Sequence, residues 1–246
     1  MSLRNSLVIL AAGIAAVLGL AVPALAGDRA LQEVMGYSRD GRYFAFEEYG
    51  IADGSGLAYV NFYITDLDTD QWVVGTPIHM QAEDEKQSLF ALRALVRAKA
   101  SARMEDLMID VPAQILALRG DGTVDVDGFH LRFGVPGYSP DAISGEYTLS
   151  LEMFDASAAL SCTDWMDTEA QGFALQLKNS SAAQIVHRDD TLPRSRGCPV
   201  TYRIFGVYLP YNAMEISRAV ALISVFAHGF EGPDRRFVAV PLASAH

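Results

Sequence analysis

Cysteine is scarce in this sequence, and the two cysteines that occur lie in the second half of the chain. They are Cys162 and Cys198. A cysteine directly after an N-terminal leader, which would be the attachment point for a lipid, is therefore absent. Two thiols without histidines at ligand spacing also lack the ligand set of a structural zinc site. These absences exclude a lipid-anchored protein and argue against a zinc-stabilised fold.

Positive charge is scarce as well, with 19 Lys and Arg residues against 30 Asp and Glu residues and a formal net charge of −11. A nucleic-acid-binding surface needs clustered Lys and Arg to neutralise phosphates. Arg93, Arg97, Lys99 and Arg103 do cluster, but their spacing suits a helix, and we expect them to form its solvated face. The balance of charge therefore argues against a nucleic-acid partner.

Long apolar runs are missing except at the N-terminus. Residues 1–5 carry one positive charge, Leu7 to Leu20 is apolar, and Ala24-Leu25-Ala26 has the small residues of a cleavage site. This three-part pattern predicts a secretory signal peptide at residues 1–26. The alternative is an uncleaved membrane anchor, because the segment nearly spans a bilayer. Pro23 and the small residues at its end favour removal.

Cleavage would leave residues 27–246 as a single secreted domain, which is long enough to build one full-sized core. No later segment is apolar enough to cross a membrane, so we expect no membrane span after cleavage. Two cysteines in an exported protein predict a disulfide between Cys162 and Cys198. By the chain-entropy argument such a bridge contributes about 3 to 4 kcal/mol to stability.

A hairpin dominates the first part of the expected domain. Asp40-Gly41 is a tight-turn pair, because glycine adopts positive φ without a Cβ clash. In the strand that follows, Phe44 and Phe46 point to one face, and Val60, Phe62 and Ile64 share a face of the next run. The loop of residues 50–56 is rich in Gly and Asp, and we expect it to be exposed, as functional loops usually are.

One long helix is expected after this hairpin. Apolar residues recur every three or four positions between Glu83 and Leu107, which predicts an amphipathic helix at residues 83–107. Glu83, Asp84 and Glu85 then fall in its first turn, where the helix dipole favours acidic side chains. The apolar stripe is interpreted as core packing rather than as a cofactor site.

The remaining chain reads as short strands separated by turn residues. The strand-like runs are residues 72–74, 114–118, 129–133, 147–153, 173–177, 202–209, 219–226 and 237–240. Ser180 to Gly197 is polar and is expected to be a long exposed loop. The pattern predicts a mostly-β (α+β) fold, with antiparallel hairpins and a meander in a sandwich or a partial propeller-like arrangement. Whether the first and last hairpins are internal repeats is left open.

Two resemblances extend this interpretation. The order Tyr37 to Phe46, followed by Phe62 to Thr69, resembles one blade of the TolB-type, WD-repeat-like β-propellers, and covers residues 36–72. A larger pattern is similar to a family of bacterial predicted secreted proteins of unknown function. Its residues here are the first hairpin through Gly54-Ser55-Gly56, Leu192 to Cys198 with Tyr202-Arg203-Ile204, and Gly229 to Arg236. This second resemblance implies secretion and a single domain, and it brings no catalytic residues.

Familiar catalytic and metal-binding motifs are absent. Ser55 lacks the Gly-x-Ser-x-Gly context of a nucleophile elbow, and the five histidines lie in different segments without ligand spacing. His187 and His228 are the histidines that we would test by mutation. The run Asp66 to Asp70 alternates aspartates like a calcium loop, but Gln71 replaces the required glycine. Weak calcium binding by such turns remains an alternative to simple backbone capping. No metal, cofactor or catalytic residue is assigned.

The candidate binding residues are arginines and the loop residues beside them. They are Asp53, Ser55, Arg194, Arg196, Asp234, Arg235 and Arg236. The planar guanidinium suits carboxylate and phosphate, so these arginines would form an anion site if the fold brings them together. The alternative is that they pair with the protein's own acids.

The sequence thus predicts a non-enzymatic binding or protein-interaction module of the bacterial periplasm, with an envelope protein or a small ligand as its partner. The alternative is an exported hydrolase with a carboxylate-based site, although no spacing in the sequence places two carboxylates about 5 to 9 Å apart. The oligomeric state is left open.

Overall fold

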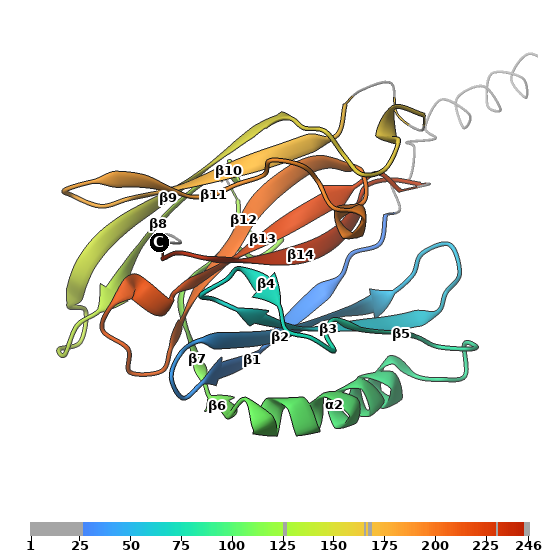
Figure 1. The fold of residues 1–246 in the computed structure, drawn as a ribbon, viewed down its shortest axis with the longest axis horizontal. Helices are drawn as coiled ribbons and strands as arrows, with labels where there is room; N and C mark the ends of the chain where they lie inside the picture. The colour runs from blue at the N-terminus through green and yellow to red at the C-terminus, as the bar shows by residue number, and fades with distance from the viewer. Residues whose placement is uncertain (1–26, 125–126, 165, 167–168, 230, 244–246) are drawn as a thin grey trace, which may run out of the picture.

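The computed structural model describes residues 27–124, 127–164, 166, 169–229 and 231–243. The predicted signal peptide, residues 1–26, lies outside the described residues. In the described part, three antiparallel sheets and one α-helix stack as four layers (Figure 1). The predicted mostly-β sandwich is therefore confirmed, and the sheets lie on top of one another rather than side by side around an axis.

The first layer of strands, which we call the N-terminal sheet, has the order β4-β3-β2-β1-β6, with β5 also pairing with β3. Its strands are β1 (Leu31–Ser38), β2 (Tyr43–Ile51), β3 (Ala58–Asp66), β4 (Gln71–Trp72), β5 (Ile78–Gln81) and β6 (Ile109–Val111). The predicted first hairpin is confirmed as β2 and β3, paired from Tyr43 with Asp66 to Ile51 with Ala58. β1 bends at Gly36, where φ is +133° and a Cβ would approach the Val111 carbonyl oxygen to 2.5 Å.

The other two sheets contain four strands each. The central sheet has the order β14-β13-β12-β7 and contains β7 (Ala113–Leu118), β12 (Pro199–Pro210), β13 (Val220–Ala227) and β14 (Asp234–Pro241). The outer sheet has the order β11-β10-β9-β8 and contains β8 (His130–Pro136), β9 (Ile143–Asp155), β10 (Gln171–Lys178) and β11 (Ala183–Arg188). Three 3-10 turns are also present, η1 (Cys162–Asp164), η2 (Arg194–Arg196) and η3 (Ile216–Arg218).

Apolar contacts fill the space between successive layers. Ala45, Phe62 and Ile64 pack against the helix, whereas Phe44 and Phe46 pack against the central sheet. The other face of the central sheet packs against the outer sheet. The N-terminal and central sheets are thus covered on both faces, which explains why β2, β3 and β13 have few polar positions. No described helix is long and apolar enough to cross a membrane.

The helix α2 (Leu89–Asp106) is shorter than predicted, because residues 83–88 are not helical. The Asp84 carboxylate accepts hydrogen bonds from the backbone N–H groups of Lys86 and Gln87, which forms a local turn in place of a helical one. Ser88 then caps the helix, its Oγ accepting a hydrogen bond from the Ala91 N–H. The acidic residues at 83–85 therefore do not lie in the first helical turn.

The basic face of α2 is only in part the solvated surface that the sequence suggested, because Lys99 and Arg103 are exposed whereas Arg93 and Arg97 are half-buried. Arg93 and Arg97 bend toward the N-terminal sheet and both bind the carboxylate of Glu47, which is fully buried. Glu33 on β1 pairs with the same two arginines. The guanidinium of Arg93 also lies 3.7 Å from the centre of the Tyr49 ring. These contacts attach the helix to the sheet beside its apolar stripe.

The prediction of a long exposed loop at Ser180 to Gly197 is also wrong in part. It contains β11, an edge strand that pairs with β10, and the short turn η2. The period-2 signal was weak because an edge strand faces solvent and carries polar residues. Asp189, which directly follows β11, is only 7% exposed, so a polar residue in this segment is not necessarily solvated.

Candidate functional site

A cleft of about 660 Å³ lies between the N-terminal sheet and the edge of the central sheet at β14, and η2 borders it. We call it the interlayer cleft. Its aromatic lining residues are Phe46, Tyr63, Trp72 and Phe237. Its charged and titratable lining residues are Glu48, Asp70, His79, His187, Arg196 and Arg236. Small-molecule sites are typically concave, mostly apolar and about 300 to 1,000 Å³, with a few convergent polar groups.

A wider hollow of about 860 Å³ lies on the outer sheet. Its charged pair, Arg132 and Glu146, is 79% and 74% exposed, and the two side chains contact each other. Exposed pairs of this kind are weak and poorly ordered. The interlayer cleft, in which charged groups are buried, is therefore the better candidate site.

Glu48 lies in the wall of the interlayer cleft and is fully buried. One carboxylate oxygen accepts hydrogen bonds of 2.9 Å from both the Asn61 amide and the Tyr63 hydroxyl. The other accepts one of 2.8 Å from the Phe237 N–H on β14. Glu48 and Asn61 are cross-strand partners, so the β2–β3 register brings them together. Burial raises the pKa of Glu48, and these hydrogen bonds with the charge of Arg236 oppose the shift only in part.

Arg236 on β14 is held by several groups. Its Nη1 donates to the Tyr59 hydroxyl at 3.0 Å, and its Nη2 donates to Asp28 at 3.1 Å. Its Nε lies 4.0 Å from Glu48, and its guanidinium lies 4.5 Å from the centre of the Tyr59 ring. The charge of Arg236 is thus largely balanced by the protein's own acids, and its position is fixed.

The opposite wall carries a second polar cluster. His187 Nε2 lies 3.1 Å from Asp189, and its Nδ1 lies 3.7 Å from Asp70 in the β3–β4 turn. The imidazole stacks on Phe173, with ring centres 4.6 Å apart. Burial lowers the pKa of His187, but the hydrogen bonds and charges of the two aspartates outweigh that effect and raise the pKa above its usual value. Protonated His187 therefore links the N-terminal sheet to the outer sheet.

Arg196 has an unusual environment for a cation. Its side chain is 11% exposed, and its Nη1 lies 3.6 Å from Asp189, too far for a hydrogen bond. Among the described residues, this buried nitrogen has no hydrogen-bond acceptor. A buried donor without an acceptor destabilises a protein by about 1 to 3 kcal/mol, and charged groups by more. Arg196 therefore offers an unused charged donor at the wall of the cleft.

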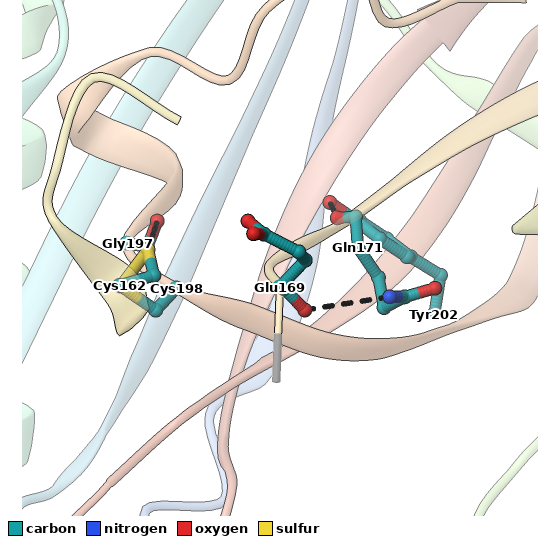
Figure 2. Close-up of a disulfide and its surroundings, with 6 residues drawn as sticks. All are labelled: Cys162, Glu169, Gln171, Gly197, Cys198 and Tyr202. Carbon is teal, nitrogen blue, oxygen red and sulfur yellow. Dashed lines mark hydrogen bonds between the residues drawn. A yellow bond between two sulfur atoms is a disulfide. The ribbon is translucent and has the colours of Figure 1, made fainter. Parts of the chain in front are cut away.

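The disulfide fixes the segment that carries Arg196. Cys162 and Cys198 are bonded, with Cα atoms 5.5 Å apart, so the predicted bridge is confirmed. Figure 2 shows it beside Tyr202, whose hydroxyl donates to the Gln171 carbonyl at 2.8 Å. Cys198 lies between Gly197, which ends η2, and Pro199, which begins β12. The bridge consequently restrains η2 from its C-terminal side.

The structure separates the predicted binding residues into groups. Arg196 and Arg236 line the interlayer cleft together, although they come from distant segments. Asp28 joins three others, because it contacts the Asp53 N–H, the Arg236 guanidinium and, through its own N–H, the Asp234 carboxylate. The loop of residues 50–56 and the start of β14 therefore meet at Asp28, a residue that the sequence did not indicate.

The other predicted binding residues lie outside the cleft. Arg194 is exposed on η2, and Ser55 is exposed with its Oγ accepting from the Leu57 N–H. Arg235 is 3% exposed, donates to the Ala30 carbonyl at 2.9 Å and pairs with Asp121. Arg235 thus has a structural environment. The sequence did not predict Glu48, Asn61 and Asp189 as site residues, because their roles depend on contacts between strands far apart in the chain.

The aspartate-rich turns are engaged by protein cations. Asp66 pairs with Arg42 at 2.6 Å, and Asp68 pairs with Arg218 at 2.6 Å. In the part of the chain that the structure describes, no group of three or more His, Cys, Asp or Glu side chains is arranged to hold a metal ion. These aspartates therefore serve to fix turns against neighbouring segments.

Stability should depend on pH through His187. The pKa of His187 is higher in the folded state than its value of about 6.5 in the unfolded state. Protonation of His187 therefore stabilises the folded protein fully when the pH lies below the unfolded-state pKa. The stabilisation is lost as pH rises through the folded pKa. The difference in unfolding free energy between wild type and His187→Gln should therefore be largest below about pH 6 and should shrink toward pH 9. Urea titrations across this range measure it.

His228→Gln is the matched control for this titration. His228 is exposed, and its side chain pairs with none of the described carboxylates. Its free energy of unfolding should stay close to that of wild type, because the exposed side chain makes no ion pair with the described residues. A difference for His187→Gln that does not change with pH would show that the aspartates do not hold the protonated imidazole.

A family model described as "predicted secreted protein (DUF2259)" matches residues 45–243. No curated protein matches the chain, and no solved structure does. The family description agrees with the secreted location expected from the sequence. The matched range contains Glu48, Arg196 and Arg236. None of these comparisons supports the resemblance of residues 36–72 to a propeller blade.

Proposed function

We propose, on the premise that the chain belongs to the family described as predicted secreted protein (DUF2259), that it is a non-enzymatic binding protein of the periplasm. Residues 27–246 act as one secreted domain. The ligand is a small organic anion, and the interlayer cleft holds it.

The observation that carries this proposal is the unused donor of Arg196. Its Nη1 is buried beside the cleft, and among the described side chains it has no hydrogen-bond acceptor. A carboxylate oxygen of a ligand would accept this donor and remove the penalty of leaving it unpaired. Arginine suits such an acceptor better than lysine because its fork presents fixed donors.

The rest of the cleft suits an organic body attached to that anion. Trp72 is 45% exposed, and its ring lies 5.7 Å from that of Tyr63. Exposed aromatic rings of this kind offer flat apolar area at little entropic loss. The volume of about 660 Å³ is large enough for a drug-sized molecule.

The second candidate function is hydrolysis, and Glu48 favours it. A buried carboxyl with a raised pKa in a cleft is typical of a general acid. However, Glu48 is fully buried and its two oxygens already accept three hydrogen bonds, two of them from side chains. Its proton would have to leave this network to reach a substrate. Binding is therefore the better supported function.

Calorimetric titration with phenylacetate, and with its neutral analogue phenylacetamide, tests the proposed binding. The ring probes the Trp72 side of the cleft and the carboxylate probes Arg196. We expect phenylacetate to bind more tightly than the amide, and Arg196→Ala to weaken phenylacetate binding about ten-fold or more. Arg194→Ala is the matched control, since Arg194 lies two residues away and is exposed. It should bind like wild type.

Equal binding by wild type and Arg196→Ala, or equal losses in both arginine variants, would contradict the proposal. Hydrolysis is tested separately with 4-nitrophenyl acetate and 4-nitrophenyl glucoside. Turnover by wild type that disappears in Glu48→Gln would favour the hydrolase instead.

A further inference from the structure

We propose that a second pocket, lined by Arg29, Arg119 and Arg203, binds the phosphate group of a small phosphorylated molecule. We call it the arginine pocket, and its volume is about 370 Å³. It shares no lining residue with the interlayer cleft. The inference therefore stands independently of the proposed function.

The arginine pocket lies against one face of the central sheet. Arg203 on β12 and Ser224 on β13 are cross-strand partners, and Ser224 is in turn the partner of Phe237 on β14. Cross-strand partners project to the same face. Phe237 also lines the interlayer cleft, so the two hollows lie on the face of the central sheet that meets the N-terminal sheet, with different lining residues.

The charge of this pocket is opposite to that of the chain. Three of its lining residues are arginines and one, Asp121, is acidic, whereas the whole chain carries a net charge of −11. Arg29 lies 3.8 Å from Asp121 and is 73% exposed. Arg203 has no ion pair with any carboxylate of the described residues. Arg29 and Arg119 thus each lie beside one aspartate, whereas the charge of Arg203 is not balanced by a described carboxylate, and such a cation marks a site for an anion.

Arg119 supplies a buried hydrogen-bond donor that no described residue accepts. Its side chain is 18% exposed, and its Nη1 lies 3.5 Å from Asp127. This buried nitrogen makes no hydrogen bond to any described residue, like that of Arg196. Its backbone is fixed at the end of β7, where the Arg119 N–H donates to the Phe205 carbonyl at 2.7 Å. A phosphate oxygen in the pocket would accept this donor.

The side chain of Arg203 is held in place by packing. Its aliphatic stem packs on Gly128, where an added Cβ would approach the Arg203 Cγ to 3.1 Å. Its guanidinium lies 6.0 Å from the centre of the Phe226 ring. A side chain packed in this way loses little entropy when it binds an anion.

The class of ligand follows from the donors and the size. Guanidinium groups bind phosphate with two parallel hydrogen bonds, and hydroxyls supply further donors. The hydroxyl residues of the pocket are Thr123, Thr201 and Ser224. Three lining arginines against Asp121 and the neighbouring Asp127 leave the pocket with a net positive charge, which suits a phosphate. The volume leaves room for a small organic group beside the phosphate.

Titration with glycerol 3-phosphate and with inorganic phosphate tests this inference, at constant ionic strength kept with chloride. We expect both to bind wild type, and Arg119→Gln with Arg203→Gln to weaken binding about ten-fold or more. The charge-matched control is Arg132→Gln with Arg188→Gln, two exposed arginines on the outer sheet. The control should bind like wild type.

The single variant Arg203→Gln tests the inference even if the double variant fails to fold. Arg203 is exposed and makes no described ion pair, so its replacement should not disturb the fold. It should lose part of the affinity at unchanged melting temperature. Arg196→Ala should leave phosphate binding intact, which separates this site from the interlayer cleft. Equal binding by wild type and the double arginine variant, or an equal loss in the control, would overturn the inference. Binding of phosphatidylglycerol vesicles without binding of glycerol 3-phosphate would also overturn it, since the source would then be a membrane surface.

Discussion

Replacing both cysteines, Cys162→Ser with Cys198→Ser, is expected to lower the free energy of unfolding by about 3 to 4 kcal/mol. The bridge closes a loop with a sequence separation of 36 residues, which contains all of β10 and β11. Without it, the unfolded chain gains conformational freedom that folding must remove. The melting temperature should fall by roughly 10 °C for a protein of this size.

Urea denaturation of the double variant and of reduced wild type measures this effect. The loss in reduced wild type should be no larger than that in the double variant, because a serine at the buried Cys162 position adds a hydroxyl to the small apolar cluster around the bridge. That cluster contains Ala156, Ala170 and Leu192 beside the cysteines. A loss below about 1 kcal/mol would mean that the unfolded chain is already restrained in this region.

The second large effect is expected for Glu47→Ala, which should lower the free energy of unfolding by about 3 kcal/mol. Glu47 is fully buried and accepts hydrogen bonds from Arg93 at 2.7 Å and from Arg97 at 2.7 Å and 3.1 Å. Its removal leaves two cations without their buried partner. The side chains of Arg93 and Arg97 are 21% and 37% exposed, and both still pair with Glu33. The expected loss of stability is therefore at the lower end of the range for a broken buried ion pair.

Glu33→Ala is the matched control, because Glu33 contacts the same two arginines but is 47% exposed. It should lower stability by about 1 kcal/mol or less. Hydrogen exchange should become faster along α2 in Glu47→Ala and change little in Glu33→Ala. Equal effects of the two substitutions would show that burial of Glu47 does not strengthen the attachment of the helix.

Much of the fold was predictable because strands that are buried on both faces form apolar and aromatic runs that stand out in the sequence. β2 and β3 alternate large apolar residues on two faces, and both faces meet another layer. The start of α2 was not predictable from its apolar stripe, because the turn at Asp84 and the cap at Ser88 decide it locally. β11 was missed because an edge strand needs few apolar residues.

The residues of the candidate site were likewise predictable only in part. Arg196 and Arg236 were found because arginines beside a cysteine and a turn stand out in an acidic chain. Their burial was not predictable, and neither was the partner Asp189, which lies in a run that reads as solvated. Glu48 gave no signal, since its environment arises only when β14 is placed beside β2. Sequence patterns specify strands and faces, whereas this cleft depends on how two sheets are stacked.

The last strand, β14, pairs with residues at the start of the described part of the chain. Arg29 and Arg235 form an isolated parallel β-bridge, and the Arg235 N–H donates to the Asp28 carbonyl at 2.7 Å. β7 joins β12 across an intervening stretch that forms the whole outer sheet. Such distant pairings are slow to form, because long loops must close first. The protein consequently acquires its native topology only once its C-terminal strand is available to pair.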